Sequence, residues 1–188
     1  MNTKTKKLST VSIVLCGMFA ALVAIGAFIQ IPVPYMDYFT LQFFFVLLAG
    51  LILGADKGAI SVGCYVLLGL VGVPIFAAGG GIGYIFRPSF GYLVGFIVSA
   101  YVTGKVCEKL KASYKNYLLA CLAGFVVTYA IGIVYKFIIL NFYAHTPATL
   151  GVIFLSCFPL DMPGDFVLCL LAAGVGLRMR KSGFYLSE

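Results

Sequence analysis

Long uncharged runs of apolar residues, separated by short clusters of charged residues, proline and glycine, make up nearly the whole chain. Cutting the sequence at these clusters gives six apolar segments, at residues 8–31, 39–54, 58–76, 89–106, 117–143 and 149–177. A helix needs about 20 apolar residues to cross the hydrocarbon core of a bilayer, and the second and third segments are the short ones. The pattern predicts an all-α integral membrane protein, a bundle of six transmembrane helices that forms a single domain over residues 1–188.

The basic residues lie mostly on one side of this predicted bundle. Placing both termini in the cytoplasm puts 11 of the 13 Lys and Arg residues on that side: Lys4, Lys6, Lys7, Lys57, Lys105, Lys109, Lys111, Lys115, Arg178, Arg180 and Lys181. Only Arg87 and Lys136 remain for the outer half. Cytoplasmic loops of membrane proteins carry such an excess of Lys and Arg, so the asymmetry predicts an even number of spans with both termini cytoplasmic.

Composition excludes most other classes of protein. Of the 188 residues, 62% are hydrophobic and 10% are charged, and the mean hydropathy is +1.09. No soluble catalytic domain fits beside six spans, and the net charge of +7 reflects membrane topology rather than a nucleic-acid site. The six cysteines form no C-x-x-C pair and no metal-ligand cluster with His145, the one histidine. No nucleophile stands at a recognisable spacing from His145, so we expect no catalytic residues, no metal and no cofactor.

Three charged residues in the outer half of the predicted membrane region are the first candidates for a ligand site: Lys136, Asp161 and Asp165. Charged side chains within a bilayer are costly and by default mark a functional site. The alternatives are that Lys136 extends to the outer interface and that Asp161 is solvated there. Pro159, Pro163 and Gly164 predict a kink or break in the last segment, which would place Asp165 in the first turn of an inner half-helix. Its carboxylate could then accept two N–H groups of a ligand such as a ureido ring, or pair with Lys136.

A glycine-rich loop follows the third segment, at residues 77–83. It is no nucleotide-binding loop, because no Gly-Lys-Ser/Thr follows and Tyr84 stands where the last glycine of G-x-G-x-x-G would fall. We expect either a flexible lid, through whose Gly80 and Gly81 the backbone approaches a small ligand, or a plain surface turn. Phe76, Tyr84 and Tyr92 would suit the apolar body of such a ligand.

Small residues form a stripe along the first segment, at Gly17, Ala20, Ala24 and Ala27. Their spacings of 3, 4 and 3 put them on one helix face, where another helix can approach closely. The spacing predicts a docking face. It leaves open whether the partner is another helix of this chain or a second protein.

Several runs of the sequence resemble one family, the biotin-specific substrate-binding subunits (S components, BioY family) of energy-coupling factor (ECF) transporters. The runs occur in the family's order and span most of the chain: Ile31-Pro32-Val33-Pro34, Thr40-Leu41-Gln42, Val46-Leu47-Leu48-Ala49-Gly50-Leu51 with Gly54, residues 68–77, Arg87-Pro88-Ser89-Phe90-Gly91-Tyr92-Leu93-Val94-Gly95-Phe96, and Pro163-Gly164-Asp165.

The resemblance implies a six-helix substrate-binding domain in the cell membrane that captures biotin from outside. It also implies partners, one transmembrane coupling protein and two ATPases, which would explain the missing ATP-binding loop. Ala20 and Ala24 match the small-xxx-small motif with which such subunits dock onto the coupling protein. The ligand-contacting residues we expect are Asp165, Lys136, Gln42, Arg87, Phe76, Gly80, Gly81, Tyr84 and Tyr92.

One position departs from the family pattern. Relatives commonly carry a Lys three residues after the Asp of Pro-Gly-Asp, and here that position is Leu168. We hypothesise that Lys136 supplies the missing cation for the ligand carboxylate, while Asp165 and Gln42 bind the polar ring. The alternatives are a different small carboxylate, such as lipoate or dethiobiotin, and an integral-membrane enzyme.

Overall fold

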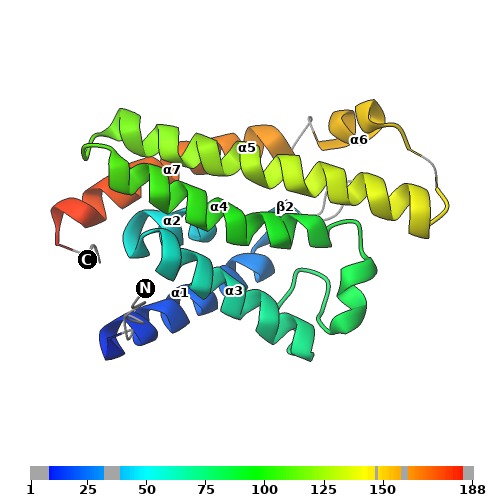
Figure 1. Cartoon of the computed structure of the whole chain (residues 1–188), viewed down its shortest axis with the longest axis horizontal. Coiled ribbons are helices and arrows are strands. Elements are labelled where there is room, and N and C mark those ends of the chain that lie inside the picture. The colour runs from blue at the N-terminus through cyan, green and yellow to red at the C-terminus, as the bar shows by residue number, and fades with distance from the viewer. Residues whose placement is uncertain (1–8, 32–38, 147, 158–160, 184–188) are drawn as a thin grey trace, which may run out of the picture.

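Helices account for almost all of the residues that the structure describes. The computed structural model describes residues 9–31, 39–146, 148–157 and 161–183, and Figure 1 shows their arrangement. The α-helices are α1 (Thr10–Phe28), α2 (Gln42–Leu53), α3 (Ala55–Val71), α4 (Phe90–Lys109), α5 (Tyr114–Ile138), α6 (Leu150–Cys157) and α7 (Asp161–Lys181). A 3-10 helix, η1 (Ile82–Phe86), precedes α4, and a π-helical turn, η2 (Ile139–Tyr143), extends α5.

Four helical stretches of the described chain are long and apolar enough to cross a membrane. They are Thr10–Phe28, Phe90–Lys109, Tyr114–Tyr143 and Asp161–Lys181. The helix α2 is apolar but has only 12 residues, and α3 has 17. The predicted helical character of this membrane protein is therefore confirmed.

The described chain has one α-helix more than the six predicted spans. Residues 149–177, expected to form a kinked or broken helix, contribute α6 and α7 on either side of the undescribed residues 158–160, so the described chain has seven α-helices. Pro163 is the third residue of α7, where its missing N–H removes no intrahelical hydrogen bond. The first turn of α7 holds Asp161, so Asp165 lies in the second turn and not in the first as expected. Pro159 lies outside the described residues.

Capping residues and glycines set the ends of several helices. The Ser9 and Ser113 side chains accept hydrogen bonds from the backbone N–H groups of Ser12 and Asn116, capping α1 and α5. Gly72 has a φ of 117° and ends α3 in the left-handed conformation that favours glycine.

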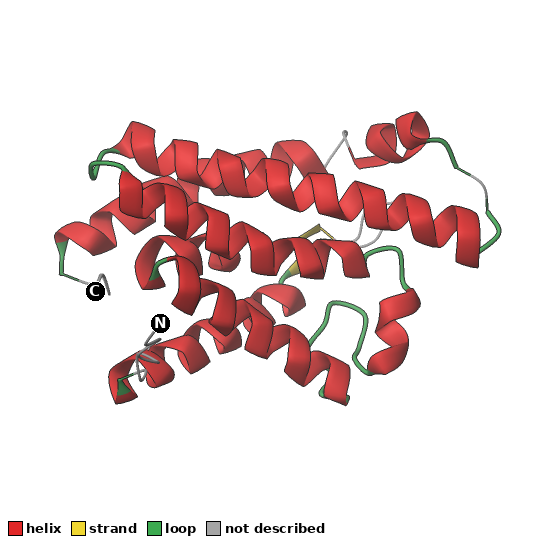
Figure 2. Ribbon diagram, viewed as in Figure 1, coloured by secondary structure: helices red, strands yellow, loops and turns green. Residues whose placement is uncertain are grey.

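The helix α2 lies at the centre of the bundle. Ten of its 12 residues are buried, and it packs against α1, α3, α4 and α7. A short antiparallel ladder of β1 (Gln30–Ile31) and β2 (Phe39–Thr40) leads from α1 into α2, as Figure 2 shows in yellow. The Leu41 N–H also donates to the carbonyls of Gly26 and Ile29 at the end of α1, 3.1 Å from each oxygen. These bonds hold the start of α2 against the end of α1.

The helices α4 and α5 lie side by side along most of their length (Figure 1). Gly132 allows this close approach, because a Cβ there would collide with the ring of Tyr92. Such small residues let membrane helices pack closely. The Tyr92 ring consequently packs against α5 at Gly132, at the edge of the cavity described next.

Candidate functional site

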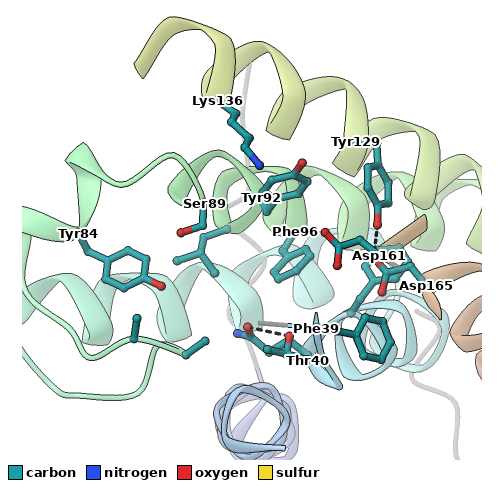
Figure 3. A pocket seen from close by; sticks show the side chains of 15 residues that line it. Phe39, Thr40, Tyr84, Ser89, Tyr92, Phe96, Tyr129, Lys136, Asp161 and Asp165 are labelled. Carbon is teal, nitrogen blue, oxygen red and sulfur yellow. Dashed lines mark hydrogen bonds between the residues drawn. The ribbon is translucent and has the colours of Figure 1, made fainter. Parts of the chain in front are cut away.

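A cavity opens between α2, α4, α5, α7 and the loop that precedes η1 (Figure 3). Its empty volume, together with the open space at its mouth, is about 810 Å³. The residues that line it are Phe39, Thr40, Gln42, Phe43, Ala77, Ala78, Tyr84, Ser89, Tyr92, Leu93, Phe96, Tyr129, Lys136, Asp161 and Asp165.

Two carboxylates from α7 lie on one side of the cavity. Asp165 Oδ2 accepts a hydrogen bond of 2.7 Å from the Tyr129 hydroxyl on α5. Asp161 lies one turn earlier on the same face of α7, as i and i+4 positions of a helix do. The Tyr129 ring is fixed by Phe125 and Tyr92, whose centroids lie 4.7 and 5.8 Å away. Tyr129 uses its only hydroxyl hydrogen on Asp165, so Tyr129 and an ionised Asp165 can only accept hydrogen bonds from a ligand.

A cation reaches the cavity from α5. Lys136 follows Tyr129 by seven residues, which places both on one face of the helix, and its ammonium group points toward the cavity in Figure 3. Ser89, at the N-cap of α4, supplies a hydroxyl to the same lining. An ammonium has three donors and no acceptor, so this side of the cavity can bind an anionic group.

A third polar group comes from the start of α2. Gln42 is 4% exposed and its side chain is held at both ends. Its Oε1 accepts from the Thr40 hydroxyl at 3.2 Å, and its Nε2 donates to the Tyr65 hydroxyl at 2.6 Å. The amide is therefore fixed in one orientation.

Aromatic rings form the remaining walls. Phe43 and Phe96 stack with centroids 5.9 Å apart, and Tyr84 closes the opposite side (Figure 3). These rings give the cavity an apolar body between its polar groups.

Five of the nine residues predicted to contact a ligand line the cavity: Asp165, Lys136, Gln42, Tyr84 and Tyr92. The structure places the other four elsewhere. Phe76 is buried behind Tyr84, with centroids 4.6 Å apart. Arg87 is exposed, with its guanidinium 5.3 Å from the centroid of the Tyr84 ring. Gly80 and Gly81 lie beside the cavity lining but outside it.

The glycine-rich loop is held by hydrogen bonds rather than free as a flexible lid would be. Phe76 and Gly79 exchange two backbone hydrogen bonds of 2.9 and 3.1 Å, and the Gly81 N–H donates to the Gly69 carbonyl at 2.7 Å. A Cβ on Gly80 would collide with the Val73 carbonyl, so glycine there serves packing within the loop. Ala77 and Ala78 are the loop residues that line the cavity.

Asp161 was a candidate from the sequence, which left open that it is solvated. Sequence reasoning missed several other lining residues, namely Phe39, Thr40, Phe43, Ala77, Ala78, Ser89, Leu93, Phe96 and Tyr129. Some had a signal. Ser89, Tyr92, Leu93 and Phe96 follow the i, i+3, i+4, i+7 spacing of one helix face, and Tyr129 shares a face with Lys136. Phe39 and Thr40 had none, because the β1–β2 ladder that brings them to the cavity has only two residues in each strand.

The predicted docking stripe on α1 is divided between the interior and the surface. Ala20 and Ala27 are 7% and 0% exposed and belong to the core of this chain, and Ala24 is partly buried. Gly17 is exposed, and a Cβ there would meet nothing within 4 Å. Its neighbours on the exposed face include Val14, Met18 and Ile25.

Comparison with known proteins places this arrangement in a family. Residues 1–183 match the model of the BioY family. The chain is 40% identical over 177 residues to a probable biotin transporter BioY of Lysinibacillus sphaericus, covering 94% of this chain and 90% of that one. It is 39% identical over 169 residues to the biotin transporter BioY of Thermotoga maritima, covering 88% and 93% of the two chains.

A solved structure has the same fold. The crystal structure of the S-component for biotin from an ECF-type ABC transporter superposes with a TM-score of 0.80 at 25% identity, covering 96% of this chain and 95% of that one. The family model, the relatives and the fold agree over nearly the full length. The chain belongs to the BioY family.

Proposed function

We propose that this chain is the biotin-binding S component of an ECF-type transporter, and that biotin binds in the cavity beneath Lys136. The main support for the proposal is that hydrogen-bond acceptors and donors lie on different sides of the cavity. Tyr129 and an ionised Asp165 offer only acceptors, and the Lys136 ammonium group offers only donors. Biotin has the complementary groups, since its ureido ring donates N–H groups and its carboxylate accepts.

Lys136 takes the part of the cation that relatives carry on the last helix. Position 168 is occupied by leucine, which is 5% exposed and lies in the hydrophobic core rather than in the cavity lining. The proposed anchor for the ligand carboxylate is therefore on α5, across the cavity from Asp165. The aromatic rings of Phe43, Phe96 and Tyr84 would enclose the apolar part of biotin.

The test is calorimetric titration of the detergent-purified chain with biotin, biotin methyl ester, dethiobiotin and lipoate. We expect one-to-one binding of biotin with a dissociation constant on the order of nanomolar, about −12 kcal/mol. Dethiobiotin keeps both ureido N–H groups and should bind, whereas lipoate has none. Binding of lipoate without biotin would identify a related carboxylate as the substrate, and silence toward all four ligands would refute the proposal.

Lys136→Met tests the anchor separately. It should weaken biotin binding by about tenfold to a hundredfold, because a charge-assisted hydrogen bond contributes about 1.5–3 kcal/mol. The uncharged methyl ester should lose less than threefold. Lys109→Met, at the far end of α4, is the matched control and should change neither affinity. Equal losses for acid and ester would rule out Lys136 as the anchor.

The chain itself is not an enzyme in this proposal. The coupling protein and two ATPase subunits would supply the energy for uptake, and the exposed part of α1 around Gly17 would contact the coupling protein. We further propose that the bundle crosses the cell membrane six times with both termini in the cytoplasm. The basic residues of the described chain support this orientation, because Lys105, Lys109, Lys111, Lys115 and Arg178 lie around the turn between α4 and α5 and near the end of α7, which are at the same end of the bundle (Figure 1).

A further inference from the structure

A chain of three hydrogen bonds runs from the cavity to the loop behind it. The Thr40 hydroxyl donates to Gln42 Oε1, Gln42 Nε2 donates to the Tyr65 hydroxyl, and the Tyr65 hydroxyl donates to the Ile75 carbonyl at 3.1 Å. Thr40 and Gln42 line the cavity. Tyr65 on α3 is 0% exposed and does not line it, so the chain connects two groups that can touch a ligand to one that cannot.

The direction of these bonds is decided at Tyr65. A carbonyl oxygen can only accept, so the single hydroxyl hydrogen of Tyr65 is used on Ile75. Tyr65 can then only accept from Gln42, which requires the NH₂ end of the amide to face it. The carbonyl end of Gln42 therefore faces Thr40, and the single hydroxyl hydrogen of Thr40 is used on that oxygen. After these bonds the Thr40 hydroxyl and Gln42 Oε1 keep free lone pairs, and Gln42 Nε2 keeps one further hydrogen.

We propose that Tyr65 is a positioning residue that sets the hydrogen-bond polarity of this side of the cavity, so that Thr40 and Gln42 accept from the head group of the ligand. The inference rests on the proposed function. It extends the acceptor surface of Asp165 and Tyr129 to a second wall, built from different helices. A head group with N–H donors on two edges can donate to both walls. A head group with an acceptor on either edge would face acceptor oxygens there and lose a hydrogen bond.

Tyr65→Phe isolates this effect, because it removes only the hydroxyl. The ring and its edge-to-face contact with Phe76, at 5.5 Å between centroids, are retained. Without the hydroxyl, Thr40 can accept from the amide as well as donate to it, so Gln42 is free to reverse. Tyr135→Phe is the control, because it removes another tyrosine hydroxyl, partly buried and bonded at 2.6 Å to the Ile85 carbonyl, from outside the cavity lining.

The experiment compares biotin with its two cyclic carbamate analogues, in each of which a ring oxygen replaces one ureido N–H. The exchange keeps the shape and turns a donor into an acceptor. For the isomer whose oxygen faces Gln42, the wild-type chain should favour biotin by about a hundredfold or more, since a site built for a donor rejects its replacement strongly. Tyr65→Phe should reduce this ratio at least tenfold, and Tyr135→Phe should leave it within twofold.

A double-mutant cycle separates positioning from general damage. In a Gln42→Met background there is no amide to orient, so adding Tyr65→Phe should change the ratio less than twofold. A merely structural role would instead weaken both ligands equally in both backgrounds, and that result overturns the inference. If Tyr65→Phe does not fold, Thr40→Val tests the same inference from the other end of the amide, with Thr40→Ser as its control. Tyr65 still orients Gln42 in Thr40→Val, so the ratio should stay within about threefold of the wild-type value. A ratio that falls about tenfold or more in Thr40→Val would show that Thr40 orients the amide, and would also overturn the inference.

The outcomes distinguish the two proposals. A wild-type chain that binds no biotin refutes the proposed function. A wild-type chain that binds biotin, with the same ratio in Tyr65→Phe, refutes only the role of Tyr65.

Discussion

At the scale of single residues, the cavity depends on where each hydroxyl hydrogen is used. Tyr129 donates to Asp165 and Thr40 donates to Gln42, so groups that could donate to a ligand are turned into acceptors. Bonds of this kind remain inside the protein whether or not a ligand is present. The cavity therefore has its polarity before the ligand arrives, which lowers the cost of ordering side chains on binding.

Asp165→Asn should weaken biotin binding by about tenfold to a hundredfold, because a hydrogen bond to a charged group contributes about 1.5–3 kcal/mol. The amide also brings two N–H donors to a wall that otherwise only accepts. Calorimetric titration measures the loss. Asp56→Asn, in the first turn of α3, makes the same chemical change away from the cavity and should leave affinity unchanged. Unaltered biotin affinity in Asp165→Asn would show that this carboxylate does not contact the ligand.

The sequence is informative about charged site residues and less so about neutral ones. Lys136 and Asp165 could be identified because a charge in an apolar run is costly without a function. Tyr65 offered no such signal, since a buried tyrosine in an apolar helix is usual. Its importance depends on the distance to Ile75, ten residues away on a different element, which no periodicity predicts.

At the scale of elements, the glycines of α4 and α5 determine how the site is assembled. Gly132→Val should lower the stability of the detergent-solubilised chain by about 1–3 kcal/mol, the usual cost of overpacking, because its side chain would collide with Tyr92. Displacing Tyr92 should also weaken biotin binding. Thermal unfolding and titration measure the two effects. Gly63→Ala in α3 is the control, because a Cβ there meets nothing within 4 Å. Equal stability of the two variants would contradict the close packing at Gly132.

The exposed part of α1 allows a separate prediction about assembly. Gly17→Leu should leave the fold and biotin affinity intact, because the space around Gly17 is open. It should reduce co-purification with the coupling protein several-fold, because a large side chain prevents close helix packing. Ala21→Leu, on the same exposed side of α1, shows how far the contact extends. Undiminished co-purification in both variants would place the docking surface elsewhere.

The length of the apolar runs predicted the long helices. It did not predict where a helix begins within an apolar segment that contains proline. The segments that became α1, α4 and α5 are long, and their apolar runs end near the observed helix ends. The last segment is equally apolar, so its composition alone gave no boundary between α6 and α7. Pro159, Pro163 and Gly164 predicted a kink or break in this segment, and Pro163 lies in the first turn of α7, a position that proline favours.

At the scale of the whole molecule, the two ends of the bundle differ in charge. The start of α1, the end of α7 and the turn between α4 and α5 lie at one end, and η1 and α6 lie at the other (Figure 1). A cysteine introduced at Ser182 should be protected from a membrane-impermeant maleimide in intact cells, and one at Ala144 should be labelled. Both should react after the membrane is permeabilised. The reverse pattern in intact cells would invert the proposed orientation.

The shortness of α2 has a consequence for where the ligand can lie. Twelve residues span about 18 Å at 1.5 Å per residue, while the hydrocarbon core is about 30 Å thick. The central column of the bundle therefore fills little more than half of that depth, and Gln42, its first residue, forms part of the cavity floor. The cavity lies at the Gln42 end of α2, within the depth that this helix does not span. If α2 were two turns longer in a member of the family, the bundle could still span the membrane, but the added turns would fill the cavity.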